Sequence, residues 1–122
     1  MNWTKSLPAA LLVSAVLALT TGAAWAHAEL VQSDPAPNTT VSAPKSIKLT
    51  FSEKLAPKFS GFDLSMGDGM DMSVTTTVSD DGKSLIGTPK GNFMAGAYKL
   101  SWHAVTVDDG HRTEGSLTFK VK

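Results

Sequence analysis

The sequence contains no cysteine. Exported proteins of this size often depend on disulfides, so a fold made from this chain must be stable without them. Thiolate catalysis, cysteine-ligated zinc and thiolate copper sites are excluded for the same reason. Any metal would have to be bound by histidine, aspartate, glutamate, methionine or a terminal amine.

The chain also lacks an excess of charge of either sign, with 11 lysine and arginine residues against 11 acidic ones. A protein that binds nucleic acid or an anionic membrane surface would need an excess of basic residues, so neither partner is indicated. No nucleophile elbow of the G-x-S-x-G type is present, so a serine hydrolase has no support. Nothing in the sequence brings two carboxylates together as a glycosidase would require.

The first 26 residues have the order of a secretory signal peptide. The terminal amine and Lys5 supply positive charge, residues 7–24 are apolar or small, and residues 24–26 form an A-x-A cleavage site. The truly apolar part, residues 9–19, is about 11 residues long, whereas a spanning helix needs about 20. We therefore predict export to the periplasm, cleavage, and a single domain over residues 27–122 that has no direct membrane insertion.

Apolar and polar residues alternate in several stretches of the predicted domain, including residues 47–52, 62–66, 98–104 and 117–122. This period of two indicates strands with one buried face, and no stretch keeps a helical period. About seven short strands in fewer than 100 residues predict an all-β, Greek-key β-sandwich of the immunoglobulin-like type, with a cupredoxin-like arrangement. The strands are expected near residues 28–33, 45–53, 59–66, 72–79, 83–88, 97–107 and 114–121.

Cleavage would make His27 the N-terminal residue. It would then offer its α-amine and its Nδ1 to one metal, and this chelating pair suits Cu(II), which prefers tetragonal nitrogen and oxygen donors. Asp109 and His111 flank a glycine that lets the loop bend, so their side chains could converge. Together with His27 they would supply three nitrogens and one oxygen, provided that the first strand lies near this loop. The alternatives are that cleavage leaves a histidine at position 27 by chance, and that residues 109–111 form an ordinary turn that binds no metal.

Three methionines, Met66, Met70 and Met72, fall in one glycine-rich segment. Thioethers select Cu(I), so a soft-metal site is one interpretation. The other is a core methionine followed by two loop methionines. A calcium loop is disfavoured because the spacing and terminal glutamate of an EF-hand are missing. His103 is predicted on the polar face of its strand, near the site or in solvent, and is the substitute ligand if His111 is not one.

Three motifs occur in a fairly specific order: His27-Ala28-Glu29-Leu30, then F-S-E at residues 51–53, then D-G-H at residues 109–111. In this combination the chain resembles the CopC family of periplasmic copper-binding proteins (copper resistance protein C), including its YobA-like members, over essentially all of residues 27–122. The resemblance implies a seven-stranded Greek-key sandwich and a Cu(II) site made by His27 with Asp109 and His111. Some relatives carry a methionine-rich Cu(I) loop, in the region of Met66, Met70 and Met72.

We therefore predict a copper chaperone or carrier for copper homeostasis or resistance, without catalytic turnover. The resemblance implies an inner-membrane copper importer of the CopD type as its partner. Protons compete with copper for imidazole and amine nitrogens, so affinity should fall below neutral pH. One alternative is a copper-dependent oxygenase with a histidine-brace-like site, although the domain is small and Trp102 is expected in the core. Another is an adhesion or interaction sandwich whose histidines are incidental.

Overall fold

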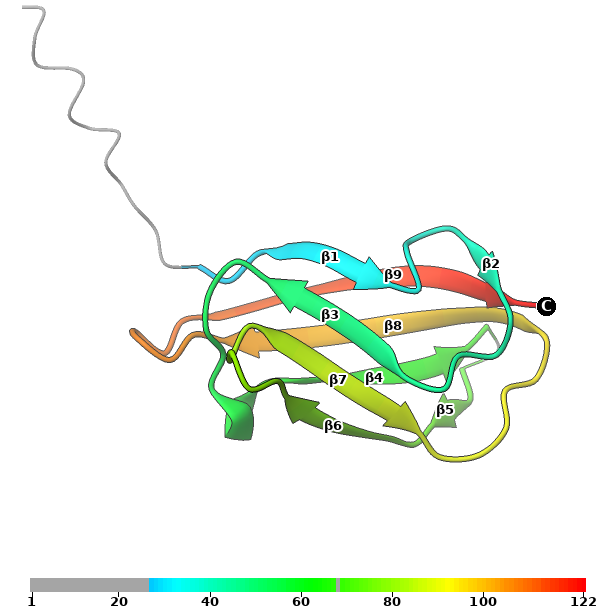
Figure 1. Cartoon of the computed structure of the whole chain (residues 1–122). Helices are drawn as coiled ribbons and strands as arrows, with labels where there is room; N and C mark the ends of the chain where they lie inside the picture. Colours follow the sequence, from blue (N-terminus) through cyan, green and yellow to red (C-terminus); the bar gives the residue numbers. More distant parts are fainter. Residues whose placement is uncertain (1–26, 68) are drawn as a thin grey trace, which may run out of the picture.

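The structure, a computed structural model, describes residues 27–67 and 69–122, so the predicted signal peptide lies outside the described residues. The described chain folds into two β-sheets (Figure 1). The strands of one sheet lie in the order β1-β3-β7-β6, and those of the other in the order β2-β9-β8-β4-β5. Their bounds are β1 Leu30–Asp34, β2 Thr40–Val41, β3 Ile47–Phe51, β4 Gly61–Met66, β5 Asp71–Met72, β6 Val74–Val78, β7 Ser84–Pro89, β8 Gly96–Val105 and β9 Arg112–Val121.

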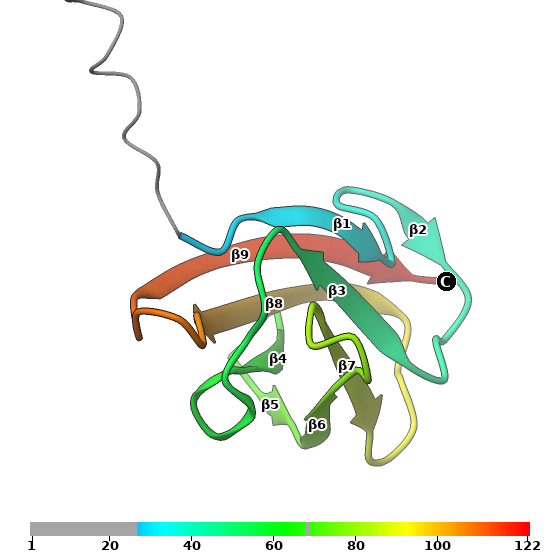
Figure 2. The ribbon, with the colours of Figure 1, turned by 60° about the vertical axis from the view of Figure 1, so that its left-hand side comes forward.

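Consecutive strands form hairpins at β4–β5, β6–β7 and β8–β9, and the connections between these hairpins pass from one sheet to the other. The β8–β9 hairpin is the longest, with paired residues from Gly96↔Val121 to Val105↔Arg112. It spans the molecule, and its turn lies at the same end as the start of the described chain (Figure 1). In both views β1 runs beside β9, although the two strands belong to different sheets (Figure 2).

The core lies between the sheets and is built from the apolar positions of the alternating stretches. In β8, Tyr98, Leu100 and Ala104 are buried, whereas Lys99 and Ser101 are exposed. The other large, fully buried side chains come from strands of both sheets, Ile47, Leu49, Phe51, Leu64, Leu85 and Phe119, and from the loop residue Leu55. Interdigitated aromatic and aliphatic side chains of this kind stabilise the domain without cross-links.

The predicted all-β sandwich is confirmed, and each predicted strand has a counterpart. The strand count was wrong, because the structure has nine strands in the described residues. Thr40–Val41 was missed because two residues carry no periodicity. The single strand predicted at 72–79 is divided at Ser73: β5 pairs with β4 in one sheet, and β6 pairs with β7 in the other. Exposed and partly buried residues alternate without a break across 71–78, so the pattern could not reveal the change of sheet.

Candidate metal site

Two histidines that are far apart in sequence lie in contact at one end of the sandwich. The imidazole rings of His27 and His111 are stacked, with their centroids 3.9 Å apart and an interplanar angle of 9°. The structure therefore brings the start of the described chain against the β8–β9 turn, which the predicted ligand set requires.

Hydrogen bonds hold the segment that carries His27. Ala28 is buried, and its carbonyl accepts a hydrogen bond from the Thr113 hydroxyl of β9 at 2.9 Å. The Glu29 N–H donates to the Ser52 hydroxyl at 3.0 Å, and the Ser52 N–H donates back to the Glu29 carbonyl at 2.9 Å. Because Ser52 directly follows β3 and Thr113 lies in β9, these hydrogen bonds tie the segment that carries His27 to both sheets.

The turn that carries Asp109 and His111 is closed on Thr106. The Thr106 N–H donates to the His111 carbonyl at 3.0 Å, and the Gly110 N–H donates to the Thr106 carbonyl, also at 3.0 Å. Gly110 has a φ of 70°, a left-handed conformation that glycine adopts without strain. The turn is therefore closed by main-chain hydrogen bonds.

The Asp109 carboxylate is held within this turn although the residue is exposed. Its Oδ1 accepts hydrogen bonds from the Thr106 hydroxyl and, at 3.0 Å, from the His111 N–H. These two bonds, the Thr106 hydroxyl first, hold the pKa of Asp109 below its usual value. A charged carboxylate therefore lies within two residues of His111, whose ring stacks on His27, and these nitrogen and oxygen donors are of the type that Cu(II) prefers.

The donors are close but are not arranged around a common point. Within residues 27–67 and 69–122, no group of three or more histidine, aspartate or glutamate side chains converges as a metal site. Imidazole lone pairs lie in the ring plane, so two parallel rings 3.9 Å apart cannot both direct a nitrogen at one ion at a bond length of about 2 Å. One ring would have to turn before both could bind. In the full-length chain, the backbone nitrogen of His27 is also a peptide nitrogen and not an amine.

His103 lies away from this pair. It is paired with Gly61 of β4 and Glu114 of β9, and it faces outward between the core residues Trp102 and Ala104. Its ring lies over Gly61, where a Cβ would be 3.6 Å from the His103 Cε1. The predicted position on the polar face is therefore confirmed, although the side chain is half-buried.

The three predicted methionines lie at the opposite end of β8. Met66 is paired with Tyr98, near the start of β8, whereas His111, on which His27 stacks, follows the other end of β8 at Val105. Met66 and Met72 pack against the core, and Met70 is 61% exposed in the turn between β4 and β5. The Met66 N–H donates to the Met70 carbonyl at 2.7 Å. The segment is thus a tight hairpin with one outward and two inward thioethers.

Sequence reasoning did not single out Met94, an exposed methionine at this same end. Its backbone N–H donates to the Tyr98 hydroxyl at 2.9 Å, and that hydroxyl donates to its carbonyl at 2.8 Å. Met94 is far from the methionine segment in sequence, so no local spacing could have connected them.

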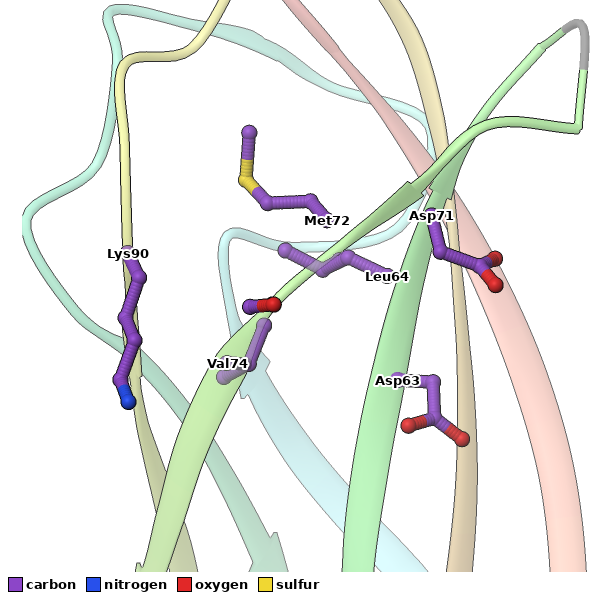
Figure 3. Close-up of a pocket in the computed structure, with 7 residues that line it drawn as sticks. Asp63, Leu64, Asp71, Met72, Val74 and Lys90 are labelled. Carbon is purple, nitrogen blue, oxygen red and sulfur yellow. The ribbon is translucent and has the colours of Figure 1, made fainter.

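A pocket of about 470 Å³ lies where β4, β5 and β6 meet (Figure 3). Asp63 and Asp71 project to one side of the strands in this view, and Met72 and Lys90 lie on the other. The carboxylates and the thioether therefore do not point at a common ligand. None of the residues that line the pocket belongs to the His27 and His111 end.

Three hydroxyl residues that hold the histidine end were not predicted: Ser52, Thr106 and Thr113. The three-residue spacing from Thr106 to Asp109 is a signal that could have been used, because such pairs often bond within a turn. The other two make contacts between distant parts of the chain and leave no local pattern.

Comparison with known proteins relates the chain to copper resistance proteins of one family. The family model described as CopC domain matches residues 30–122. The chain is 43% identical over 117 residues to copper resistance protein C of Xanthomonas campestris pv. juglandis, covering 90% of this chain and 91% of that protein. It is also 43% identical over 111 residues to copper resistance protein C of Pseudomonas syringae pv. tomato, covering 85% and 87%.

Among solved structures, the chain resembles PcoC, a methionine-rich copper resistance protein from Escherichia coli. The two superpose with a TM-score of 0.74 at 38% identity, covering 80% of this chain and all of that one. In the described part of this chain, no helix has the length and apolar character needed to cross a membrane. The predicted family resemblance is confirmed.

Proposed function

This chain belongs to the CopC domain family, and from that premise we propose that it is a periplasmic copper carrier that binds Cu(II) at the His27 end of the sandwich. The observation that carries the proposal is the contact between His27 and His111 beside a carboxylate held in the same turn. The protein binds and releases copper without turnover, for copper homeostasis or resistance. An inner-membrane importer of the CopD type is its proposed recipient.

The ligands are the α-amine and imidazole of His27, the imidazole of His111 and one oxygen of Asp109. Since Oδ1 of Asp109 accepts the two hydrogen bonds of the turn, Oδ2 is the oxygen left to bind the ion. Binding requires cleavage after residue 26, which creates the amine, and rotation of one imidazole out of the stack. Both changes are local, since hydrogen bonds at Ala28 and Glu29 hold the flanking backbone.

The test is a Cu(II) titration of the protein purified with a verified His27 N-terminus, followed by electron paramagnetic resonance. We expect one tight site with nitrogen-rich tetragonal parameters, which His27→Ala and His111→Ala each abolish. His103→Ala is the matched control and should leave the site intact, because His103 faces the outer surface of the sheet. A wild-type affinity no tighter than that of a free peptide beginning with histidine would refute the proposal.

We further propose that Met66, Met70 and Met72 bind Cu(I). The support is their shared hairpin at the end of the sandwich away from the histidines, together with the preference of thioethers for soft ions. Met70→Leu should weaken Cu(I) binding under reducing conditions and leave Cu(II) binding unchanged. Met94→Leu, at the same end but in another loop, is the control. Equal effects of the two substitutions would contradict this ligand set.

The alternative of a copper-dependent oxygenase is tested with the same protein. Trp102 packs edge-on against Phe51, with ring centroids 5.0 Å apart at 71°, and so does not offer a flat aromatic surface to a polysaccharide. Ascorbate-driven peroxide production or polysaccharide cleavage by the copper-loaded protein, above the level of free copper, would favour the oxygenase over the carrier.

A further inference from the structure

We infer that Thr106 is a positioning residue for the copper site: its hydroxyl holds Asp109 so that the second carboxylate oxygen faces the ion. This inference rests on the proposed Cu(II) site and deepens it. It concerns a side chain that would not itself touch copper.

Thr106 is one of the most firmly held residues at this end of the molecule. Only 2% of its surface is exposed, and it forms a β-bridge with Leu55. Its main chain bonds to His111 and Gly110 on one side, and the next residue, Val107, donates to the Lys54 carbonyl at 3.0 Å. The Thr106 hydroxyl is therefore attached to backbone that is anchored in the sandwich, whereas Asp109 lies in the exposed turn.

Asp109, in contrast, is exposed, and its carboxylate would sample several rotamers if nothing held it. The Thr106 hydroxyl donates to Oδ1, the same oxygen that accepts the His111 N–H. With Oδ1 accepting two hydrogen bonds, the rotation of the carboxylate is restricted, and Oδ2 is the oxygen left to bind an ion. A ligand that is already oriented loses less entropy when the ion binds.

The same hydroxyl also reaches the second ligand of the turn. The His111 N–H lies 3.3 Å from Thr106 Oγ1 and 3.0 Å from Asp109 Oδ1, so one N–H is shared between the two oxygens. Thr106, Asp109 and the backbone of His111 thus form one hydrogen-bonded unit. Removing the hydroxyl would remove one hydrogen bond to the Asp109 carboxylate and one from the His111 N–H at the same time.

The experiment compares Thr106→Val, which keeps the shape and removes the hydroxyl, with Thr106→Ser, which keeps the hydroxyl and removes a methyl group. The protein is exported, cleaved and checked for its His27 N-terminus. Cu(II) affinity is then measured by competition with a chelator, and the copper spectrum by electron paramagnetic resonance. Loss of a residue that orients a metal ligand typically costs about 10–100-fold in affinity. We expect a loss of this size and an altered spectrum for Thr106→Val, with Thr106→Ser close to wild type.

Ser60→Ala is the control for a merely structural loss. Ser60 is also buried at this end, and its hydroxyl accepts from the Val105 N–H at 3.0 Å, one residue before Thr106. It should lower stability while leaving affinity and spectrum unchanged. Wild-type affinity and spectrum in Thr106→Val, or an equal loss in Ser60→Ala, would overturn the inference while the Cu(II) site stands. Failure of the wild-type protein to bind would instead refute the proposed function itself.

Discussion

Replacing Gly87 with alanine should destabilise the domain, because this glycine in β7 lies directly under a ring of the opposite sheet. A Cβ at Gly87 would be 2.1 Å from Phe62 Cζ and 2.8 Å from Val74 Cγ1. Ordinary contacts begin near 3.4 Å, so the ring would have to move by roughly 1 Å. Phe62 is only 4% exposed, and little space is available for that movement.

The expected magnitude follows from two opposing effects. Overpacking a well-filled core costs about 1–3 kcal/mol, and here the overlap is severe. Alanine is better than glycine within a strand by about 0.5–1 kcal/mol, which offsets part of the cost. A net loss of about 2 kcal/mol in the free energy of unfolding corresponds to a fall in Tm of about 10 °C for a domain of this size.

The assay is urea unfolding followed by the fluorescence of Trp102, the one tryptophan in residues 27–122. Gly67→Ala is the matched control, because a Cβ there meets nothing within 4 Å, and its stability should stay within about 0.5 kcal/mol of wild type. Phe62→Leu in the Gly87→Ala background should recover part of the loss, since the smaller side chain makes room. A Gly87→Ala protein as stable as Gly67→Ala would refute the packing argument.

Three further predictions concern the ends and turns of the sandwich. One extra residue placed ahead of His27 in the exported protein should greatly weaken Cu(II) binding, because it displaces the amine; unchanged binding in a titration would remove the amine from the ligand set. Thr113→Val should lower the unfolding free energy by about 1 kcal/mol and also weaken Cu(II) binding, because it leaves the buried Ala28 carbonyl without its donor. Unfolding free energy and Cu(II) affinity are measured on the same sample. A loss of stability with unchanged affinity would show that this hydrogen bond does not position His27 for binding. Hydrogen bonds from the Ser79 hydroxyl and then from the Lys83 N–H lower the pKa of Asp81 from 3.8, so ionised Asp81 stabilises the fold above that value, and this contribution is lost as the pH falls through the lowered pKa. The stability difference between wild type and Asp81→Asn should be constant from neutral pH to about pH 5 and should shrink below 3.8. A difference that persists at the lowest pH would contradict this.

Alternation predicted the strands because each has one face in the core, as in β8, where Tyr98, Leu100 and Ala104 point inward. It could not predict where a strand changes sheets. At Ser73 the chain passes from one sheet to the other while its alternation continues, because both sheets face the same core. Which strands pair is decided by contacts between distant residues, and a local pattern does not contain them.

The candidate site was predictable to the extent that chemistry depends on residue type. Histidine at position 27, with aspartate and histidine at 109 and 111, was sufficient to suggest a copper ligand set. The stacking of His27 on His111 was not predictable, because it depends on the backbone path of two segments far apart in sequence. The hydroxyls that hold these segments, such as Thr113, were missed because serine and threonine are common on every polar face.

The contact between His27, the first described residue, and the β8–β9 hairpin also bears on how this cysteine-free chain would resist unfolding. An ion shared by His27 and His111 would join two points that enclose most of the described chain, as a long-range disulfide does in proteins that contain one. An ion bound only by the folded form, at 100 times its Kd, would add about 2.7 kcal/mol to the free energy of unfolding. Under the proposed function, the cargo would act as a removable cross-link, and the protein would be most resistant to unfolding and proteolysis while loaded.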